Sequence, residues 1–103
     1  MRIQLKKFGT MLTSRQSGRE ALAAFQPALS ENKAGEDIEI DFSGVTTFSP
    51  SWGDEFLRPL YETYKDKLSL VDTPNLSVRA SLEILEGANK MKFQRRALGS
   101  ARS

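Results

Sequence analysis

Cysteine and histidine are both absent from this chain of 103 residues. The first absence excludes disulfides and thiol nucleophiles, and the second excludes zinc sites of the usual kind and catalytic triads with an imidazole base. No apolar run approaches the roughly 20 residues of a membrane-spanning helix, and the N-terminus lacks the apolar segment of a signal peptide. We therefore expect a cytoplasmic protein without a membrane partner, and we predict no metal and no cofactor.

Basic residues are few in most of the chain and gather at its end. Residues 1–89 hold ten Lys or Arg against thirteen Asp or Glu, a net charge of −3, whereas residues 90–103 hold five basic residues and no acid. A chain of this length forms one domain. We expect a single domain over residues 1–89 and a flexible basic tail over residues 90–103.

Alternating apolar residues predict strands, and apolar residues three or four positions apart predict helices. In chain order the pattern predicts strand, helix, strand, helix, strand, helix, over residues 2–8, 18–30, 36–42, 50–65, 68–71 and 75–86. Met11 and Leu12 are candidates for a second short strand. The first two strands have one apolar and one charged face, which favours an α/β (α+β-like) fold with helices packed on one face of the sheet.

Local signals set the expected ends of the helices. Ser17 and Glu20 form a capping box that would start the first helix, and Pro27 predicts a kink or an end near residue 26. Pro59 should bend the second helix. Gly87 is a plausible stop for the third.

Residues 41–57, DFSGVTTFSPSWGDEFL, are the most informative segment. Asp41 ends a strand, and we favour a structural role in which its carboxylate accepts backbone N–H groups in the turn at Ser43 and Gly44. A direct ligand or catalytic role for Asp41 is the alternative. Ser49 before Pro50 predicts a helix N-cap.

Ser51 lies in the first turn of that helix, near free N–H groups and the positive end of the helix dipole. A phosphate on Ser51 would gain from the dipole but would face Asp54 and Glu55. The other interpretation is that both serines only cap the helix. Trp52 is either a core residue or an exposed anchor of an interface.

Two arginines precede and enter the first predicted helix. Arg15 and Arg19 are either solvated cations or contacts for an anion near the helix start.

The 41–57 segment resembles the STAS domain superfamily. Small members of that superfamily, the anti-sigma-factor antagonists, carry the motif D-L-S-G-V-x-x-x-D-S-S-G, whose second serine is phosphorylated. DFSGV at 41–45 matches its opening, and Ser51 falls on the phosphorylated serine, although the motif's acid and glycine are replaced here by Ser49 and Trp52. The chain is more similar to a divergent STAS-like group, through SRQSGRE at 14–20 and SWGDEF at 51–56.

The resemblance covers about residues 8–86, and it implies a mixed β-sheet with helices on one face and a regulatory role without catalysis. The implied partner is a protein, either a kinase-like ATPase of the sensor-kinase type or an anti-sigma factor. We place its binding surface on residues 49–62, with six contributors: Ser49, Ser51, Trp52, Asp54, Glu55 and Arg58.

Two other functions compete with this one. The basic tail, with Phe93 among its cations, could bind nucleic acid by phosphate contacts and base stacking, although the mildly acidic body disfavours it. An enzyme would have only carboxylates such as Asp41 and Asp54 to use, so we predict no catalytic residues. The sequence does not define an oligomeric state.

Overall fold

The computed structural model describes residues 1–31 and 36–97. Its elements in chain order are strand β1 (Arg2–Gln4), a 3-10 turn (Leu5–Phe8), β2 (Met11–Leu12), helix α1 (Arg15–Ser30), β3 (Ile38–Asp41), β4 (Thr47–Phe48), α2 (Pro50–Tyr64), a second 3-10 turn (Lys65–Lys67), β5 (Leu68–Val71), α3 (Leu76–Asn89) and β6 (Gln94–Arg96). The predicted order of strands and helices is confirmed.

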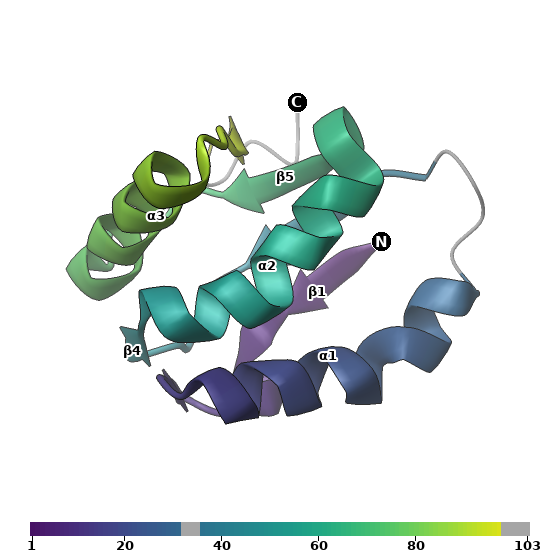
Figure 1. Cartoon of the computed structure of the whole chain (residues 1–103), viewed down its shortest axis with the longest axis horizontal. Coiled ribbons are helices and arrows are strands. Elements are labelled where there is room, and N and C mark those ends of the chain that lie inside the picture. The colour runs from purple at the N-terminus through teal and green to yellow at the C-terminus, as the bar shows by residue number, and fades with distance from the viewer. Residues whose placement is uncertain (32–35, 98–103) are drawn as a thin grey trace.

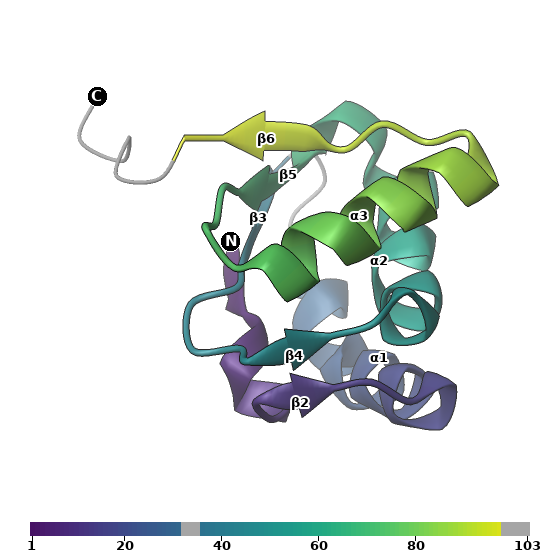
Figure 2. The same cartoon turned by 90° about the vertical axis from the view of Figure 1, so that its left-hand side faces the viewer.

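The main sheet has four strands in the order β1-β3-β5-β6, and β2 pairs with β4 in a small second sheet. The three α-helices all cover the same face of the main sheet (Figures 1 and 2). The opposite face carries ion pairs between strands, with Arg2 and Arg96 both meeting Glu39. The predicted α/β fold, with helices on one face, is confirmed.

One feature of the sheet differs from the implied fold. Each strand pairing among the described residues is parallel, so this part of the chain shows no mixed sheet. The physical reason is that a helix separates β1 from β3 and β3 from β5, and α3 separates β5 from β6. Such crossovers return the chain to the same edge of the sheet and favour parallel pairing.

The core lies between the sheet and the helices. Ile38 and Ile40 of β3 and Leu68 and Leu70 of β5 point to the helices and are almost fully buried. The aromatic part of the core belongs to α2, where Trp52 and Phe56 are stacked with ring centroids 4.9 Å apart. Aromatic side chains contribute large buried areas, so this cluster fixes α2 on the sheet.

The first helix starts earlier than the predicted capping box implies. Ser14 is its N-cap, and the Ser14 hydroxyl accepts the backbone N–H of Ser17 at 3.0 Å. Ser17 therefore lies inside α1, where its hydroxyl accepts the indole Nε1–H of Trp52 at 3.2 Å. A buried indole N–H needs such an acceptor, and this tertiary bond is what the local sequence pattern does not reveal.

One of the two outcomes predicted from Pro27, an end of α1 near residue 26, is wrong, and so is the predicted stop of α3 at Gly87. The kink that Pro27 predicts as the alternative stays a prediction. Pro27 does not end α1 near residue 26, because Phe25 and Leu29 on either side of it stay packed in the core. Gly87 does not end α3, which continues to Asn89 and stops at Lys90 in a left-handed conformation.

The C-terminal segment corrects the expected boundary at residue 89. Met91 and Phe93 are buried, and β6 (94–96) pairs with β5 at the edge of the sheet. Burial of these two apolar side chains binds the segment to the domain. The packed domain therefore extends to residue 96, and residues 98–103 of the predicted tail lie outside the described residues.

Candidate functional site

The turn after β3 brings the chain from the sheet to α2. The Asp41 carboxylate is buried and accepts the backbone N–H of Ser43 at 2.9 Å. Burial acts most strongly and opposes its ionisation, but the bonds from Ser43 and the charges of Arg2 and Lys6 together lower its pKa. Gly44 has φ +87°, and an added Cβ would meet the Lys6 side chain at 2.9 Å, so this position needs glycine. Asp41 and Gly44 therefore both have structural roles in the turn after β3.

The start of α2 is capped by Ser49, which the structure ties down on both sides. Its hydroxyl accepts the backbone N–H of Trp52 at 3.2 Å and donates to the carbonyl of Thr13 at 2.7 Å. Pro50 follows at the first helical position. Ser49 therefore holds the helix start against the segment before α1.

Trp52 was one of the predicted partner contacts, and the structure rules out an exposed anchor there. Its side chain is fully buried, between Phe48 and Phe56 and beneath α1. The reason is the helix period: Trp52, Phe56 and Leu60 are four residues apart and share the inner face.

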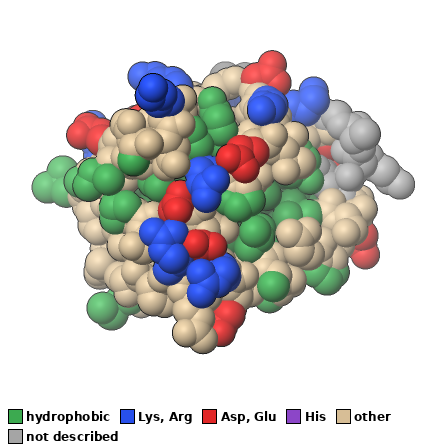
Figure 3. All heavy atoms as spheres, viewed as in Figure 1, with side chains coloured by type: hydrophobic (Ala, Val, Ile, Leu, Met, Phe, Trp, Pro, Cys, Tyr) green, Lys and Arg blue, Asp and Glu red, His purple; other side chains and the backbone are tan. Residues whose placement is uncertain are grey.

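The outer face of α2 carries the polar candidates. Ser51, Asp54, Glu55, Arg58 and Glu62 follow one another at helical spacing, and all are at least partly exposed. Arg58 donates from Nε to Asp54 at 2.7 Å and from Nη1 to Glu62 at 3.2 Å. Figure 3 shows a band of alternating acidic and basic side chains across this side of the molecule.

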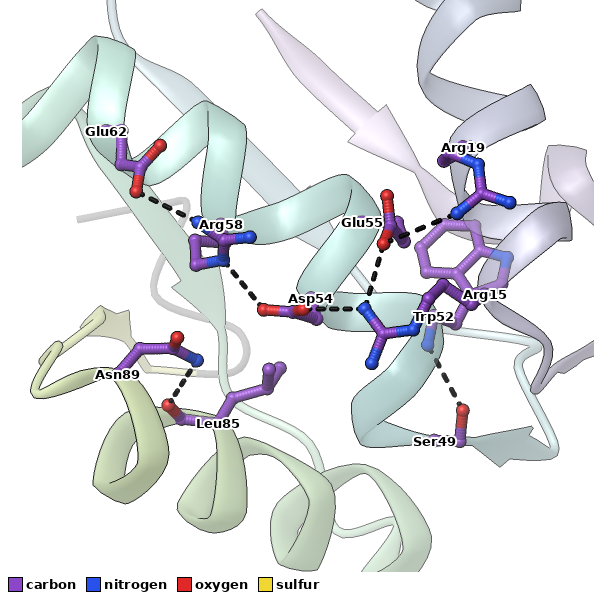
Figure 4. Close-up of polar contacts among 10 residues, drawn as sticks. All are labelled: Arg15, Arg19, Ser49, Trp52, Asp54, Glu55, Arg58, Glu62, Leu85 and Asn89. Atoms are coloured by element: carbon purple, nitrogen blue, oxygen red, sulfur yellow. Dashed lines mark hydrogen bonds and ion pairs between the residues drawn. The ribbon is translucent and has the colours of Figure 1, made fainter.

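Helix α1 supplies the other half of this charge network. Arg15 Nη1 donates to Asp54 at 2.7 Å and to Glu55 at 2.8 Å, and Arg19 Nη1 lies 3.6 Å from Glu55 (Figure 4). The two arginines predicted to contact an anion thus meet carboxylates of the chain itself.

These pairs shift the ionisation of their members. The hydrogen bond from Arg15, followed by the one from Arg58, lowers the pKa of Asp54 although partial burial opposes this. The same bonds to Asp54 raise the pKa of Arg15 and of Arg58. The network joins three arginines, Arg15, Arg19 and Arg58, to three carboxylates, Asp54, Glu55 and Glu62.

A hollow of about 190 Å³ lies beside this network. Arg15 and the first turn of α2, with Pro50, Ser51 and Asp54, form one wall, and the end of α3 forms the other with Ile84, Leu85, Ala88 and Asn89. Among residues 1–31 and 36–97 the Ser51 hydroxyl forms no hydrogen bond. Ser51 is thus a partly exposed residue of the hollow without a hydrogen-bond partner among the described residues.

Sequence reasoning missed the wall supplied by α3. Ile84 is 57% exposed although it is strongly apolar. A signal was present, because the apolar stripe of α3 consists of Val78, Leu82 and Leu85 and leaves Ile84 outside it. Ile84 lies outside this stripe and lines the hollow together with Ala88, so the two add apolar surface to its α3 wall.

Three residues of the competing nucleic-acid hypothesis, Phe93, Arg95 and Arg96, are engaged within the domain. Phe93 is 1% exposed and packs on Tyr61 with ring centroids 5.5 Å apart, so the predicted stacking on a base is wrong. Arg95 pairs with Glu86 at 3.1 Å, and Arg96 pairs with Glu39. Residue 102, the last arginine of the tail, lies outside the described residues.

The part of the chain that the structure describes holds no cluster of three carboxylate side chains that could bind a metal ion. Within the same residues, none of the helices has the length and apolar character needed to cross a bilayer.

Comparison with known proteins assigns the chain to a family through its central segment. A search of curated proteins and a search of solved structures each returned no match. The family model described as "STAS-like domain of unknown function (DUF4325)" matches residues 24–75, slightly more than half of the chain. The match runs from the middle of α1 through α2 and β5 to the start of α3, and it includes Ser51 and the outer face of α2. The chain belongs to this family of STAS-like domains.

Proposed function

We propose that this STAS-like domain is a non-enzymatic regulatory module of the cytoplasm that binds a partner protein. The binding site is the surface around the hollow between α2 and α3, formed by Arg15, Ser51, Asp54, Arg58, Ile84 and Asn89, which we call the α2–α3 surface. The observation that carries the proposal is the exposed Ile84 beside this hollow.

The chemistry of the α2–α3 surface fits a protein interface. Interfaces combine an apolar centre with a polar rim, and a few central side chains supply most of the binding energy. Here Ile84 and Ala88 supply the apolar centre, and the paired side chains Arg15, Asp54 and Arg58 supply the rim. Ile84 takes the anchoring role that the sequence suggested for Trp52.

The partner that the resemblance favours is a kinase-like ATPase, as found in sensor kinases and anti-sigma factors. Such a partner would also transfer the γ-phosphoryl group of ATP to the Ser51 oxygen, releasing ADP and the hydroxyl proton. The free Ser51 hydroxyl in the first turn of α2 supports this modification. The acids that oppose a phosphate, Asp54 and Glu55, are both paired with Arg15, which weakens the opposition.

The test is a titration of this chain with a purified ATPase domain of the sensor-kinase type. We expect Ile84→Asp to weaken binding at least tenfold, because it places a charge at the apolar centre. Leu76→Asp is the matched control, since Leu76 is an exposed apolar residue (79%) at the other end of the same helix. Equal affinities of the folded Ile84→Asp and Leu76→Asp variants would remove the α2–α3 surface from the proposal.

Phosphorylation is tested separately, by incubating the chain with the same ATPase domain and ATP and mapping the product by mass spectrometry. Modification of Ser51, lost in Ser51→Ala, is the expected result. Phosphate found only at other residues would exclude Ser51 as the acceptor.

A further inference from the structure

The contacts of Arg15 with the carboxylates of α2 use only part of its guanidinium group. A single nitrogen, Nη1, makes both the bond to Asp54 and the bond to Glu55. A guanidinium has five N–H donors, and it binds oxyanions best through two nitrogens in parallel. Among the described residues, Nε and Nη2 of Arg15 make no hydrogen bond, and Figure 4 shows them turned away from the two carboxylates.

Ser51 lies on the side of α2 that meets Arg15. It lies three and four residues before Asp54 and Glu55, so it occupies the same face of α2 one turn earlier. Arg15 and Ser51 also line the same hollow. Any group attached to the Ser51 oxygen therefore enters the space into which the Arg15 side chain faces, and Arg15 remains movable because its side chain is 49% exposed.

The charges of the network make it sensitive to an added phosphate. Arg15, Arg19 and Arg58 are balanced by Asp54, Glu55 and Glu62. A phosphoserine adds a charge of about −1.5 to −2 and three strong acceptor oxygens. Arg15 lines the hollow together with Ser51 and has unused donors, so it is the arginine placed to respond.

We propose that Arg15 is the sensor of phosphorylation at Ser51. The phosphate accepts two N–H groups of Arg15 in a forked geometry, and in exchange the guanidinium gives up its single-nitrogen contacts with Asp54 and Glu55. Asp54 keeps its bond from Arg58, and Glu55 keeps Arg19 as its neighbour. The network of three arginines and three carboxylates then changes from balanced to negative, because the phosphate adds a charge of about −1.5 to −2. This change would alter the affinity for the partner, and the inference rests on the phosphorylation that we propose for Ser51.

The test uses the full chain with phosphoserine installed at position 51 during synthesis, so that it needs neither a kinase nor a partner. A ³¹P NMR titration measures the second pKa of the phosphate, which is about 6 for a free phosphoserine. We expect a value below that in the wild-type chain. Arg15→Gln should raise it by about 0.5 pH units, the size of an exposed ion pair.

Arg58→Gln is the matched control, because Arg58 is a second arginine bound to Asp54, one turn farther along α2. The control should raise the pKa of the phosphate much less than Arg15→Gln does. Equal rises of the phosphate pKa in the two variants would show that Arg15 acts only through its charge, as Arg58 does, and does not bind the phosphate. A phosphate pKa above 6 in the wild-type chain that Arg15→Gln leaves unchanged would show that the phosphate is repelled. Either result overturns the inference.

Should Arg15→Gln fail to fold, Arg15→Lys gives the second measurement. Lysine keeps the charge but lacks the fork, so a rise of the phosphate pKa in Arg15→Lys supports forked binding. An unchanged value in Arg15→Lys contradicts the forked geometry. A failure of the ATPase to bind or phosphorylate the chain would count against the proposed function and would leave these titrations unaffected.

Discussion

The two faces of α2 differ in what they do for the molecule. The inner face buries Trp52, Phe56 and Leu60 almost completely. The outer face presents Ser51, Asp54 and Arg58 in contacts that water can reach. Buried aromatic side chains stabilise a fold by several kcal/mol each, whereas exposed ion pairs contribute between nothing and about 1 kcal/mol. The inner face therefore maintains the fold, and the outer face can change its partners with little effect on stability.

The largest effect is expected from Trp52→Ala. The substitution removes a fully buried ring and leaves the Ser17 hydroxyl without its indole donor. We expect the free energy of unfolding to fall by about 3–5 kcal/mol. Urea denaturation followed by circular dichroism measures this, because the variant has lost the single tryptophan of the chain.

The comparison on the outer face is Glu62→Ala. Glu62 is exposed, and within the described part of the chain its one ion pair is with Arg58. We therefore expect a change below about 0.5 kcal/mol. A loss of stability for Glu62→Ala near that of Trp52→Ala would contradict the division of α2 into two faces.

A pair of glycine substitutions makes the same comparison at closer range. Gly18 of α1 faces α2, and an added Cβ would come within 2.7 Å of the Trp52 carbonyl oxygen. Gly18→Ala should therefore force the helices apart and destabilise the chain by about 1–3 kcal/mol. Gly87 of α3 is exposed, and an added Cβ meets nothing within 4 Å. Gly87→Ala should stabilise the helix by up to about 1 kcal/mol.

Thermal denaturation of the two alanine variants gives opposite shifts in Tm if the contacts decide the outcome. A rise in Tm for Gly18→Ala would mean that α1 and α2 can separate without cost, and the close packing at Trp52 would then carry little energy.

Much of this architecture could be predicted from the sequence because its patterns are local. The alternation in β3 placed Ile38 and Ile40 on a buried face, and Ser49 with Pro50 fixed the start of α2. The side-chain partners were not predictable in the same way. Ser17 matched a capping box, but its hydroxyl receives Trp52 from a helix 35 residues away. Spacing placed Trp52 on the same face as Phe56, but it could not tell whether the first turn of α2 is covered by α1.

The C-terminal segment is the second case where distant contacts decided the result. Lys90, Lys92 and Arg95 look like part of a solvated tail, and the composition favours that interpretation. The apolar side chains between them, Met91 and Phe93, instead dock on the core, and β6 gains a pairing with β5. The α3 wall of the candidate site was missed for a related reason, since the exposure of Ile84 depends on how α3 rests against α2.

A small effect that depends on pH is expected on the outer face of α2, at Asp54. Its folded pKa is lowered, chiefly by the hydrogen bond from Arg15. The folded chain thus binds fewer protons here than the unfolded chain, and stability rises with pH. The contribution of Asp54 is complete above the unfolded pKa of about 4 and is lost as the pH falls through the lowered folded value.

We therefore expect Asp54→Asn to cost about 0.5–1 kcal/mol at pH 7, after allowance for solvent screening, and nearly nothing near pH 2. Urea denaturation of both proteins across this range gives the difference. Asp66→Asn is the control, because Asp66 is exposed and forms no ion pair among the described residues. The free energy of unfolding of Asp66→Asn should differ from that of the wild type by the same amount at each pH. A difference for Asp54→Asn that stayed constant down to pH 2 would show that the substitution acts through packing. The outer face would then also stabilise the fold through packing, as the inner face does, and Arg15 would be less free to leave Asp54.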